Sequence, residues 1–343
     1  MNPYVTDILS QPTALRKAVQ KFSIAPLAPI VARLQNDEFD RIVITGMGAS
    51  YNAAYPACLQ LSSLPIPVTM VNAAELVHYM DGQIGTRTLL WANSQSGRSA
   101  ELLHLLQRLE PTPPACVLAS INDETSSLAT AADICLPVHA GPESTVSTKT
   151  YVNTLAVNLL AAQQLAGRDI EPPKIAMLTA ADRIERFLSN WQARVNELDE
   201  LLGNFENLIL LGRGASMSAV WNGALTNKEA AKFSLEGMHA AEFRHGPLEL
   251  VAPGFCAMIF AGPSATSVLN RKLAADIVEH GGCAIWLDAL ADPELPTYTF
   301  PVVDSIRPIT EILPMQMLTL VMARRKGVEP GIFRFIEKIT TTE

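Results

Sequence analysis

The feature that most constrains the fold is an internal repeat. The stretch RIVITGMGASYNAAYPACLQL, which starts at Arg41, resembles NLILLGRGASMSAVWNGALTN, which starts at Asn207. Each passes from an apolar run through Gly-x-Gly-Ala-Ser into a segment compatible with a helix, 166 residues apart. A second pair, PACVLASIND around Cys116 and GCAIWLDALAD around Cys283, keeps nearly this spacing. A register that holds over two apolar runs indicates duplication, so we expect two similar halves within the 343 residues.

Within each half, short apolar runs alternate with longer segments of helical period, which is the pattern of parallel strands joined by crossover helices. We therefore expect an α/β protein with two parallel sheets, each flanked by helices. A helix rich in Arg, Glu and Leu is predicted from Ala180 to Leu202, after a hinge marked by Pro172 and Pro173. Strands are predicted near residues 41–46, 67–71, 88–93, 115–120 and 133–137, and then near 207–211, 255–261, 282–287 and 298–302.

Composition argues against several classes of protein. Charged residues make up 17% of the chain and the net charge of −8 contains no basic cluster, so we expect no nucleic-acid partner. The N-terminus lacks the basic start and apolar run of a secretory signal, and the most apolar helical stretch, 155–166, carries Asn158 and two glutamines. We therefore expect a cytoplasmic protein without membrane contact.

The five cysteines show no Cys-x-x-Cys spacing and are predicted to be buried free thiols.

Two turns of the first half could hold an anion. Gly46-Met47-Gly48-Ala49-Ser50 and Ser94-Gln95-Ser96-Gly97-Arg98-Ser99 each follow a predicted strand and open a helix, where backbone N–H groups and the helix dipole favour negative charge. Parallel strands end at one edge of a sheet, so the two turns can converge. The hydroxyls of Ser50, Ser94, Ser96 and Ser99, with the Gln95 amide, would offer a phosphate many neutral donors.

Plainer interpretations of these turns remain open. The first is also compatible with a tight turn, and less well with a dinucleotide site, because Tyr51 stands where that fingerprint requires glycine. The serines of the second could simply cap a helix. The repeat favours a ligand site, since the second half replaces ANSQSGRS with FAGPSATS and places Pro263 in the loop. By this interpretation the first half has kept an anion-binding turn that the second half has lost.

The second half carries a possible acid–base pair. Glu229 lies on the helix after the second Gly-x-Gly-Ala-Ser turn, and His245 comes just before Gly246-Pro247. A carboxylate and an imidazole brought to one pocket can move protons near neutral pH. A surface glutamate and a capping histidine would explain the same residues.

Five motifs then carry a family likeness: GMGASYNAA, SQSGRSAELL, GPESTVSTKTY, LGRGASMSAVWNGALTNKE and HAAEFRHGPLELV. In this order they resemble the paired sugar isomerase (SIS) domains of the isomerase half of glucosamine-6-phosphate synthase, as does the tail EKITTTE. The resemblance implies two flavodoxin-like αβα sandwiches. The expected organisation is a helical segment over 1–30, a phosphate-binding SIS domain over 31–170, a linker helix over 171–203, a second SIS domain over 204–328 and a closing tail over 329–343.

The resemblance also implies roles for individual residues. Glu229 corresponds to the proton-transferring glutamate, His245 to the ring-opening histidine and Lys338 to the tail lysine that closes over the sugar. In this family the histidine comes from the neighbouring subunit, so a homodimer with shared sites is implied. The phosphate and substrate contacts implied for the first domain are those of Ala49, Ser50, Ser94, Gln95, Ser96 and Ser99, with Ser147, beside Lys149, in a loop one residue shorter than the family's.

Departures from the family pattern leave the substrate open. The glutaminase domain is missing from this sequence, so we expect no glutamine-dependent amination. Thr226 stands where the synthase has a lysine, Asn222 where it has a glutamate, and Arg98 replaces an acidic residue of the phosphate loop.

We therefore expect a sugar-phosphate isomerase or amino-sugar-phosphate deaminase that moves a proton between C1 and C2 without a metal or nucleotide cofactor. No metal is needed because the proton moves between adjacent carbons and the charge stays on oxygen or nitrogen, and consistently no His-x-x-x-His or clustered carboxylate motif occurs. A deglycase that releases an amino acid from a sugar-phosphate adduct uses the same chemistry. A sugar-phosphate sensor is the alternative from another class, although no helix-turn-helix pattern precedes the first half.

Overall fold

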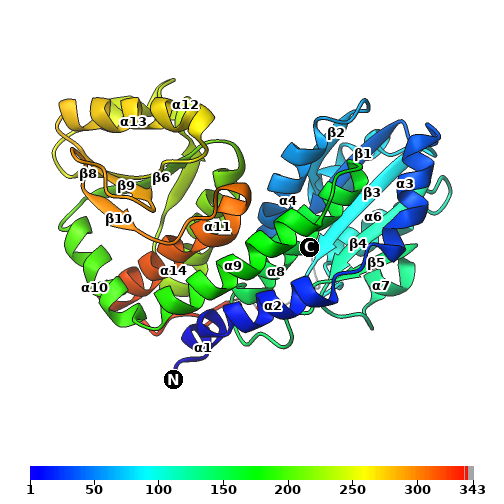
Figure 1. The fold of residues 1–343 in the computed structure, drawn as a ribbon, viewed down its shortest axis with the longest axis horizontal. Coiled ribbons are helices and arrows are strands. Elements are labelled where there is room, and N and C mark those ends of the chain that lie inside the picture. The colour runs from blue at the N-terminus through cyan, green and yellow to red at the C-terminus, as the bar shows by residue number, and fades with distance from the viewer. Residues whose placement is uncertain (336, 339–343) are drawn as a thin grey trace. The chain divides into compact units, whose positions relative to one another are not determined.

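The computed structural model describes residues 1–335, 337 and 338. It contains two compact units, each built around one five-stranded sheet (Figure 1). The N-terminal lobe comprises Thr13–Glu143, Ser147–Leu178 and the described residues after Ile332, and the C-terminal lobe comprises Met1–Pro12, Ser144–Val146 and Thr179–Ile332.

The sheet of the N-terminal lobe is wholly parallel and has the order β2-β1-β3-β4-β5. All five strands lie within one residue of their predicted positions, because each is an apolar run bounded by turn residues. Its strands are β1 (Arg41–Gly46), β2 (Val68–Asn72), β3 (Thr88–Ser94), β4 (Cys116–Ile121) and β5 (Ile134–Pro137). Its helices are α2 (Gln11–Lys21), α3 (Ala28–Gln35), α4 (Gly48–Leu61), α5 (Ala73–His78), α6 (Ala100–Leu109), α7 (Ser127–Ala131) and α8 (Lys149–Leu165).

Helices cover both faces of this sheet, which explains why its strands are apolar without alternation. Ile42, Leu89 and Trp91 pack on one face, with α3, α4 and α8. Val43 and Leu90 point to the other face, toward α5 and α6. A sheet covered by helices on both faces exposes only the ends of its strands, so we expect a ligand-binding site at these strand ends.

The C-terminal lobe repeats this plan with the strand order β10-β9-β8-β6-β7, again parallel. One face packs against α12 and α13, and α11 makes extensive contact with α14. The strands are β6 (Asn207–Gly212), β7 (Glu236–His239), β8 (Phe255–Phe260), β9 (Cys283–Asp288) and β10 (Thr297–Thr299). The helices are α1 (Pro3–Leu9), α9 (Glu171–Leu188, which begins in the N-terminal lobe), α10 (Trp191–Leu202), α11 (Met217–Ala231), α12 (Ala240–Phe243), α13 (Ser264–Glu279) and α14 (Arg307–Arg325).

Three details differ from the sequence prediction. Strand β7 was not predicted, because it has four residues, lies at the sheet edge and carries the exposed Glu236 and a glycine. The segment 171–203 holds two helices, α9 and α10, rather than one. Pro172 and Pro173 lie in the first turn of α9, where a missing N–H costs nothing, rather than in a hinge before it.

The second Gly-x-Gly-Ala-Ser turn is filled by a side chain of its own lobe. Glu311, in α14, is fully buried, and its Oε1 accepts hydrogen bonds from Ser216 Oγ at 2.9 Å and Arg307 Nε at 3.3 Å. Its Oε2 is buried without a hydrogen-bond partner among the described residues. Burial raises the pKa of Glu311 to about 7, against the opposing effect of the Arg307 guanidinium.

This carboxyl group predicts a pH-dependent stability. The pKa of this carboxyl group is higher in the folded state than its ordinary value of 4.5. Its contribution to stability is therefore fully present below pH 4.5, and it is lost as the pH rises through about 7. We expect the free energy of unfolding from urea titrations to fall between about pH 4.5 and pH 7, by up to about 1.4 kcal/mol per pH unit for each such group. Glu311→Gln should flatten the slope, leaving a part that Glu229 contributes with the same sign. An unchanged slope in the variant would contradict the assignment.

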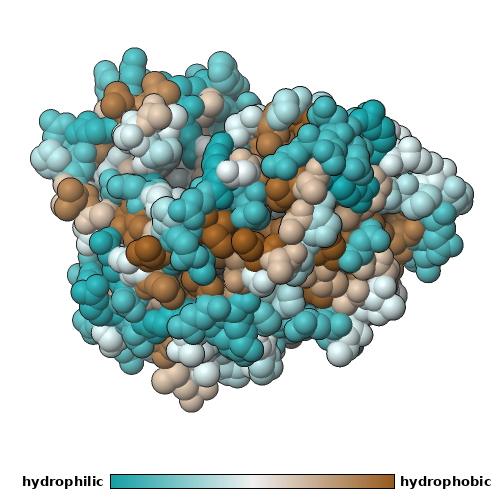
Figure 2. All heavy atoms as spheres, turned by 45° about the vertical axis from the view of Figure 1, so that its right-hand side comes forward, coloured by the Kyte–Doolittle hydropathy of each residue, from teal (hydrophilic) through white to brown (hydrophobic). Residues whose placement is uncertain are grey.

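Hydrophilic residues predominate over the face drawn in Figure 2, with smaller groups of hydrophobic residues between them. No helix in the described part of the chain combines the length and the apolarity that a membrane span requires.

Candidate functional site

The two predicted anion-binding turns lie side by side in the N-terminal lobe. Strands β1 and β3 are paired in parallel, with Gly46 opposite Asn93, so both turns leave the same edge of the sheet. The backbone N–H of Gln95 donates to Ser50 Oγ at 3.3 Å, which joins the second turn to the first turn of α4. Ala49 and Ser50 are half-buried residues of that helix, whose first N–H groups have no partner within the helix. The predicted convergence of the turns is confirmed.

The serine hydroxyls of this cradle, formed by Ser50 and Ser94–Ser99, mostly accept hydrogen bonds from the backbone. Ser94 Oγ accepts from Gly97 N at 3.1 Å and shares a 3.0 Å hydrogen bond with Ser99 Oγ. Ser96 Oγ accepts from Arg98 N at 3.2 Å. A hydroxyl that accepts a bond keeps its own proton to donate, so Ser50 and Ser96 retain an O–H for an anion. Ser99 precedes α6 but its side chain makes no capping hydrogen bond, which weakens the helix-cap interpretation.

Gly97 fixes the shape of this turn. Its φ of +63° is one that side chains disfavour, and a Cβ there would lie 1.9 Å from Ser126 Oγ. Its carbonyl accepts from Leu128 N at 3.0 Å, which fastens the cradle to α7. The neighbouring Arg98 is exposed and pairs with Asp123 at 2.8 Å, so its charge is already balanced.

A chain of buried polar groups lies beneath the cradle. Trp91 Nε1 donates to Ser120 Oγ at 2.9 Å, and Ser120 Oγ donates to Asn158 Oδ1 at 2.7 Å. Asn158 Nδ2 donates to Asn93 Oδ1 at 2.7 Å, and Asn93 Nδ2 donates to the Thr45 carbonyl at 3.2 Å. These contacts tie β1, β3, β4 and α8 together directly below the strand ends. Sequence analysis missed this network, although an asparagine in the most apolar helix was a signal for it.

The predicted substrate loop is organised by Glu143, which sequence analysis also missed. This buried carboxylate accepts hydrogen bonds from Thr148 N at 2.9 Å, Thr150 N at 3.1 Å and Thr150 Oγ1 at 2.6 Å, and so caps α8. Ser147 Oγ lies 2.8 Å from Thr150 Oγ1. Lys338 Nζ donates to the Glu143 carbonyl and lies 3.4 Å from its carboxylate. The tail lysine therefore contacts the same loop as Ser147.

Glu229 occupies a half-buried position near the end of α11 in the C-terminal lobe. Burial raises the pKa of Glu229 to about 7, and the Lys232 ammonium opposes this shift. Lys232 ends the helix in a left-handed conformation, with φ +54°, and its Nζ donates to the Glu229 carbonyl. A carboxyl group with such a pKa can both take and return a proton near neutral pH.

His245 is exposed and lies beyond α12, away from Glu229. Helix α11 joins the parallel strands β6 and β7, so it returns the chain from the carboxyl edge of the sheet to its amino edge. Glu229 near its end and His245 after β7 therefore lie toward opposite edges of one sheet, and no hydrogen bond or ion pair joins them among the described residues. The nearer histidine to α11 is His239, which packs edge-on against Trp221 at 5.3 Å and whose pKa is lowered by burial.

Two residues of α11 that differ from the family pattern, Thr226 and Asn222, are buried within the lobe. Thr226 is buried and donates to the Asn222 carbonyl at 3.0 Å, so its hydroxyl is already used. Asn222 is fully buried, and neither side-chain atom has a hydrogen-bond partner in the described part of the structure.

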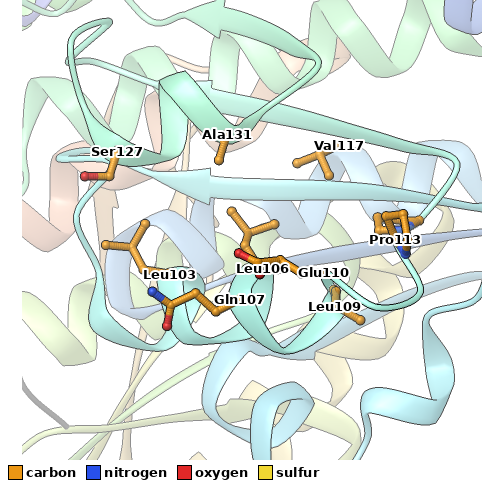
Figure 3. Close-up of a pocket in the computed structure, with 10 residues that line it drawn as sticks. Leu103, Leu106, Gln107, Leu109, Glu110, Pro113, Val117, Ser127 and Ala131 are labelled. Atoms are coloured by element: carbon orange, nitrogen blue, oxygen red, sulfur yellow. The ribbon is translucent and has the colours of Figure 1, made fainter.

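A cavity of about 430 Å³ in the N-terminal lobe differs in character from the cradle. Figure 3 shows Leu103, Leu106 and Leu109 of α6 on one side of it, with Val117 and Ala131 on the other. Its apolar lining does not suit a sugar phosphate. Nor does any group of three or more His, Cys, Asp or Glu side chains gather as metal ligands would, within the described residues.

Comparison with known proteins identifies the domain family of the first half of the chain. The SIS domain family matches residues 37–163. Over 356 aligned residues the chain is 30% identical to a glutamine–fructose-6-phosphate aminotransferase (isomerizing) of Pyrococcus horikoshii, covering 98% of this chain. The chain spans 57% of the length of that relative.

Solved structures share the complete two-lobed fold. The C-terminal domain of glucosamine-fructose-6-phosphate aminotransferase from Francisella tularensis superposes with a TM-score of 0.80 at 23% identity, covering 96% of this chain and 97% of that one. Glucosamine-6-phosphate deaminase from Thermotoga maritima gives 0.76 at 20% identity, with 98% and 99% covered. The chain is thus an α/β protein with tandem SIS domains, and it resembles the C-terminal domain of the glutamine–fructose-6-phosphate aminotransferases.

Proposed function

We propose that this protein is a sugar-phosphate isomerase or amino-sugar-phosphate deaminase that moves a proton between C1 and C2 of its substrate. The observation that carries the proposal is the serine cradle, where the hydroxyls of Ser50, in the first turn of α4, and of Ser96, in the turn after β3, keep protons to donate. Neutral donors and a helix dipole suit a phosphate dianion in a protein of net charge −8. The likeness to a relative named for fructose 6-phosphate and to a structure named for glucosamine 6-phosphate supports this substrate class.

In the proposed mechanism the cradle holds the phosphate and His245 assists ring opening. Glu229 removes a proton from one carbon and returns it to its neighbour, through an enediol or enolamine. Lys338, which donates a hydrogen bond to the Glu143 carbonyl in this structure, would move to the substrate and stabilise the developing oxyanion. If C2 carries nitrogen, the same transfer produces an imine that water hydrolyses with release of ammonia.

The mechanism also requires a homodimer. Glu229 and His245 lie toward opposite edges of one sheet, so a pocket that uses both would take one of them from a neighbouring copy. We propose that the partner supplies His245, as the family resemblance implies.

The decisive experiment offers hexose, hexosamine and glycated-amine 6-phosphates to the purified protein in D₂O. Binding would be followed by thermal shift, and ammonia, ketose and deuterium at C1 or C2 by enzymatic assay and NMR. We expect deuterium incorporation with at least one substrate, and the accompanying product separates isomerase, deaminase and deglycase. Binding with neither product formation nor deuterium exchange would support the sensor, and the absence of binding would contradict the whole proposal.

A further inference from the structure

Two cysteines of the C-terminal lobe lie side by side on neighbouring strands. Cys256 in β8 and Cys283 at the start of β9 are paired residues of parallel strands. Paired residues on adjacent strands point to the same face, and strands lie about 4.8 Å apart. That spacing falls inside the range of roughly 4.4–6.8 Å between the Cα atoms of disulfides. A bond between these thiols therefore needs little backbone movement.

The two thiols have complementary environments. Cys283 is half-buried and follows Gly281 and Gly282 in a turn, whereas Cys256 is 1% exposed. A hydrogen bond between the thiols lowers the pKa of Cys283, and the same bond together with burial raises the pKa of Cys256. An accessible thiolate beside a second, buried thiol is the arrangement found in cysteines that react with peroxides.

The internal repeat supplies a natural comparison. Cys116 opens β4 at the position that corresponds to Cys283, 167 residues earlier. Its paired residue on β3 is Leu89, which corresponds to Cys256 at the same spacing. Without a thiol neighbour, Cys116 is buried and its pKa is raised to about 11, mainly by burial. The pKa values of Cys58 and Cys135 are also raised by burial.

We propose that Cys256 and Cys283 form a redox-active dithiol that a hydroperoxide converts into an intrachain disulfide. The Cys283 thiolate attacks one peroxide oxygen, the O–O bond breaks, and water or an alcohol leaves with a proton. The Cys256 sulfur then attacks the sulfur of the Cys283 sulfenic acid, the S–O bond breaks, and water leaves with the Cys256 proton. Two thiols lose two electrons in total, and the peroxide is reduced.

The test uses the reduced, full-length protein and hydrogen peroxide, followed by alkylation, intact mass measurement and peptide mapping. We expect a loss of two hydrogen atoms, a cross-link between the peptides of Cys256 and Cys283, and reversal by dithiothreitol. Before oxidation, iodoacetamide should modify Cys283 at least about tenfold faster than Cys116 near pH 7.5.

Serine variants separate the two roles. Cys256→Ser should leave Cys283 as a sulfenic acid that dimedone traps, and Cys283→Ser should abolish the reaction. Cys116→Ser is the matched control and should behave as the wild type. Equal alkylation of Cys283 and Cys116, or peroxide treatment that oxidises thiols without this cross-link, would overturn the proposal. None of these readouts depends on sugar-phosphate binding, so the result stands apart from the proposed function.

Discussion

Glu229→Gln is expected to lower turnover of the sugar phosphate by about 10²- to 10⁴-fold while leaving its binding intact. The amide keeps the shape and half-buried position of the side chain but cannot accept a proton from carbon. Turnover is best measured as kcat, with binding measured separately by calorimetry. Loss of binding together with turnover would assign Glu229 to the pocket wall instead.

The pH profile gives an independent check of the same residue. The pKa of Glu229 is raised to about 7, and only the ionised carboxylate is a base, so the kcat of the wild type should rise with pH through that value. Glu236→Gln is a matched control, since Glu236 is an exposed carboxylate in the same lobe. It should leave both kcat and its pH profile unchanged.

Gly97→Ala is expected to abolish phosphate binding by the N-terminal lobe and to destabilise the protein. The left-handed conformation alone costs about 1–3 kcal/mol for a residue with a side chain. The new Cβ would also lie 1.9 Å from Ser126 Oγ, so either α7 or the cradle must shift. Urea unfolding measures the first effect, and the affinity for a hexose 6-phosphate measures the second.

A second variant, Gly167→Ala, separates the cost of the left-handed backbone conformation from the effect of the clash with Ser126. Gly167 belongs to the same lobe and has a φ of +68°, yet a Cβ there would meet nothing within 4 Å. We expect it to lose stability of the same order as the backbone cost, without losing affinity. Equal losses of affinity in the two variants would show that the clash with Ser126 is irrelevant to the cradle.

Strand positions could be predicted because each buried strand is an apolar run with clear ends. Strand β7 could not, since its four residues lie at an edge where a glutamate and a glycine are tolerated. The cysteines show a similar limit. All five are free, as predicted, and Cys116 and Cys256 are buried. The prediction of burial was wrong for Cys58, Cys135 and Cys283, which are half-buried, because an apolar neighbourhood in sequence does not show how far a side chain lies from the surface.

The candidate site was predictable where it depends on turns and not where it depends on distant partners. Ser50 and the serines from Ser94 to Ser99 could be placed together because both turns follow adjacent parallel strands. The contacts of Glu143 with Lys338 and of Asn93 with Asn158 join residues 195 and 65 positions apart, which no local pattern encodes. The proposed roles of Glu229, His245 and Lys338 still come from the family resemblance and stay predictions.

The carboxyl group of Glu311 affects how many phosphorylated ligands one chain can bind. Its Oε1 accepts a hydrogen bond from Ser216, the serine of the second turn, so the chain itself supplies the oxygen acceptor that this copy of the motif could otherwise have taken from solution. If the proposed phosphate site is correct, duplication produced one turn that takes its anion from solution and one turn whose serine is bonded to a carboxyl group of the same chain. A titration should saturate at a single phosphorylated molecule per polypeptide, however closely the two halves match in outline.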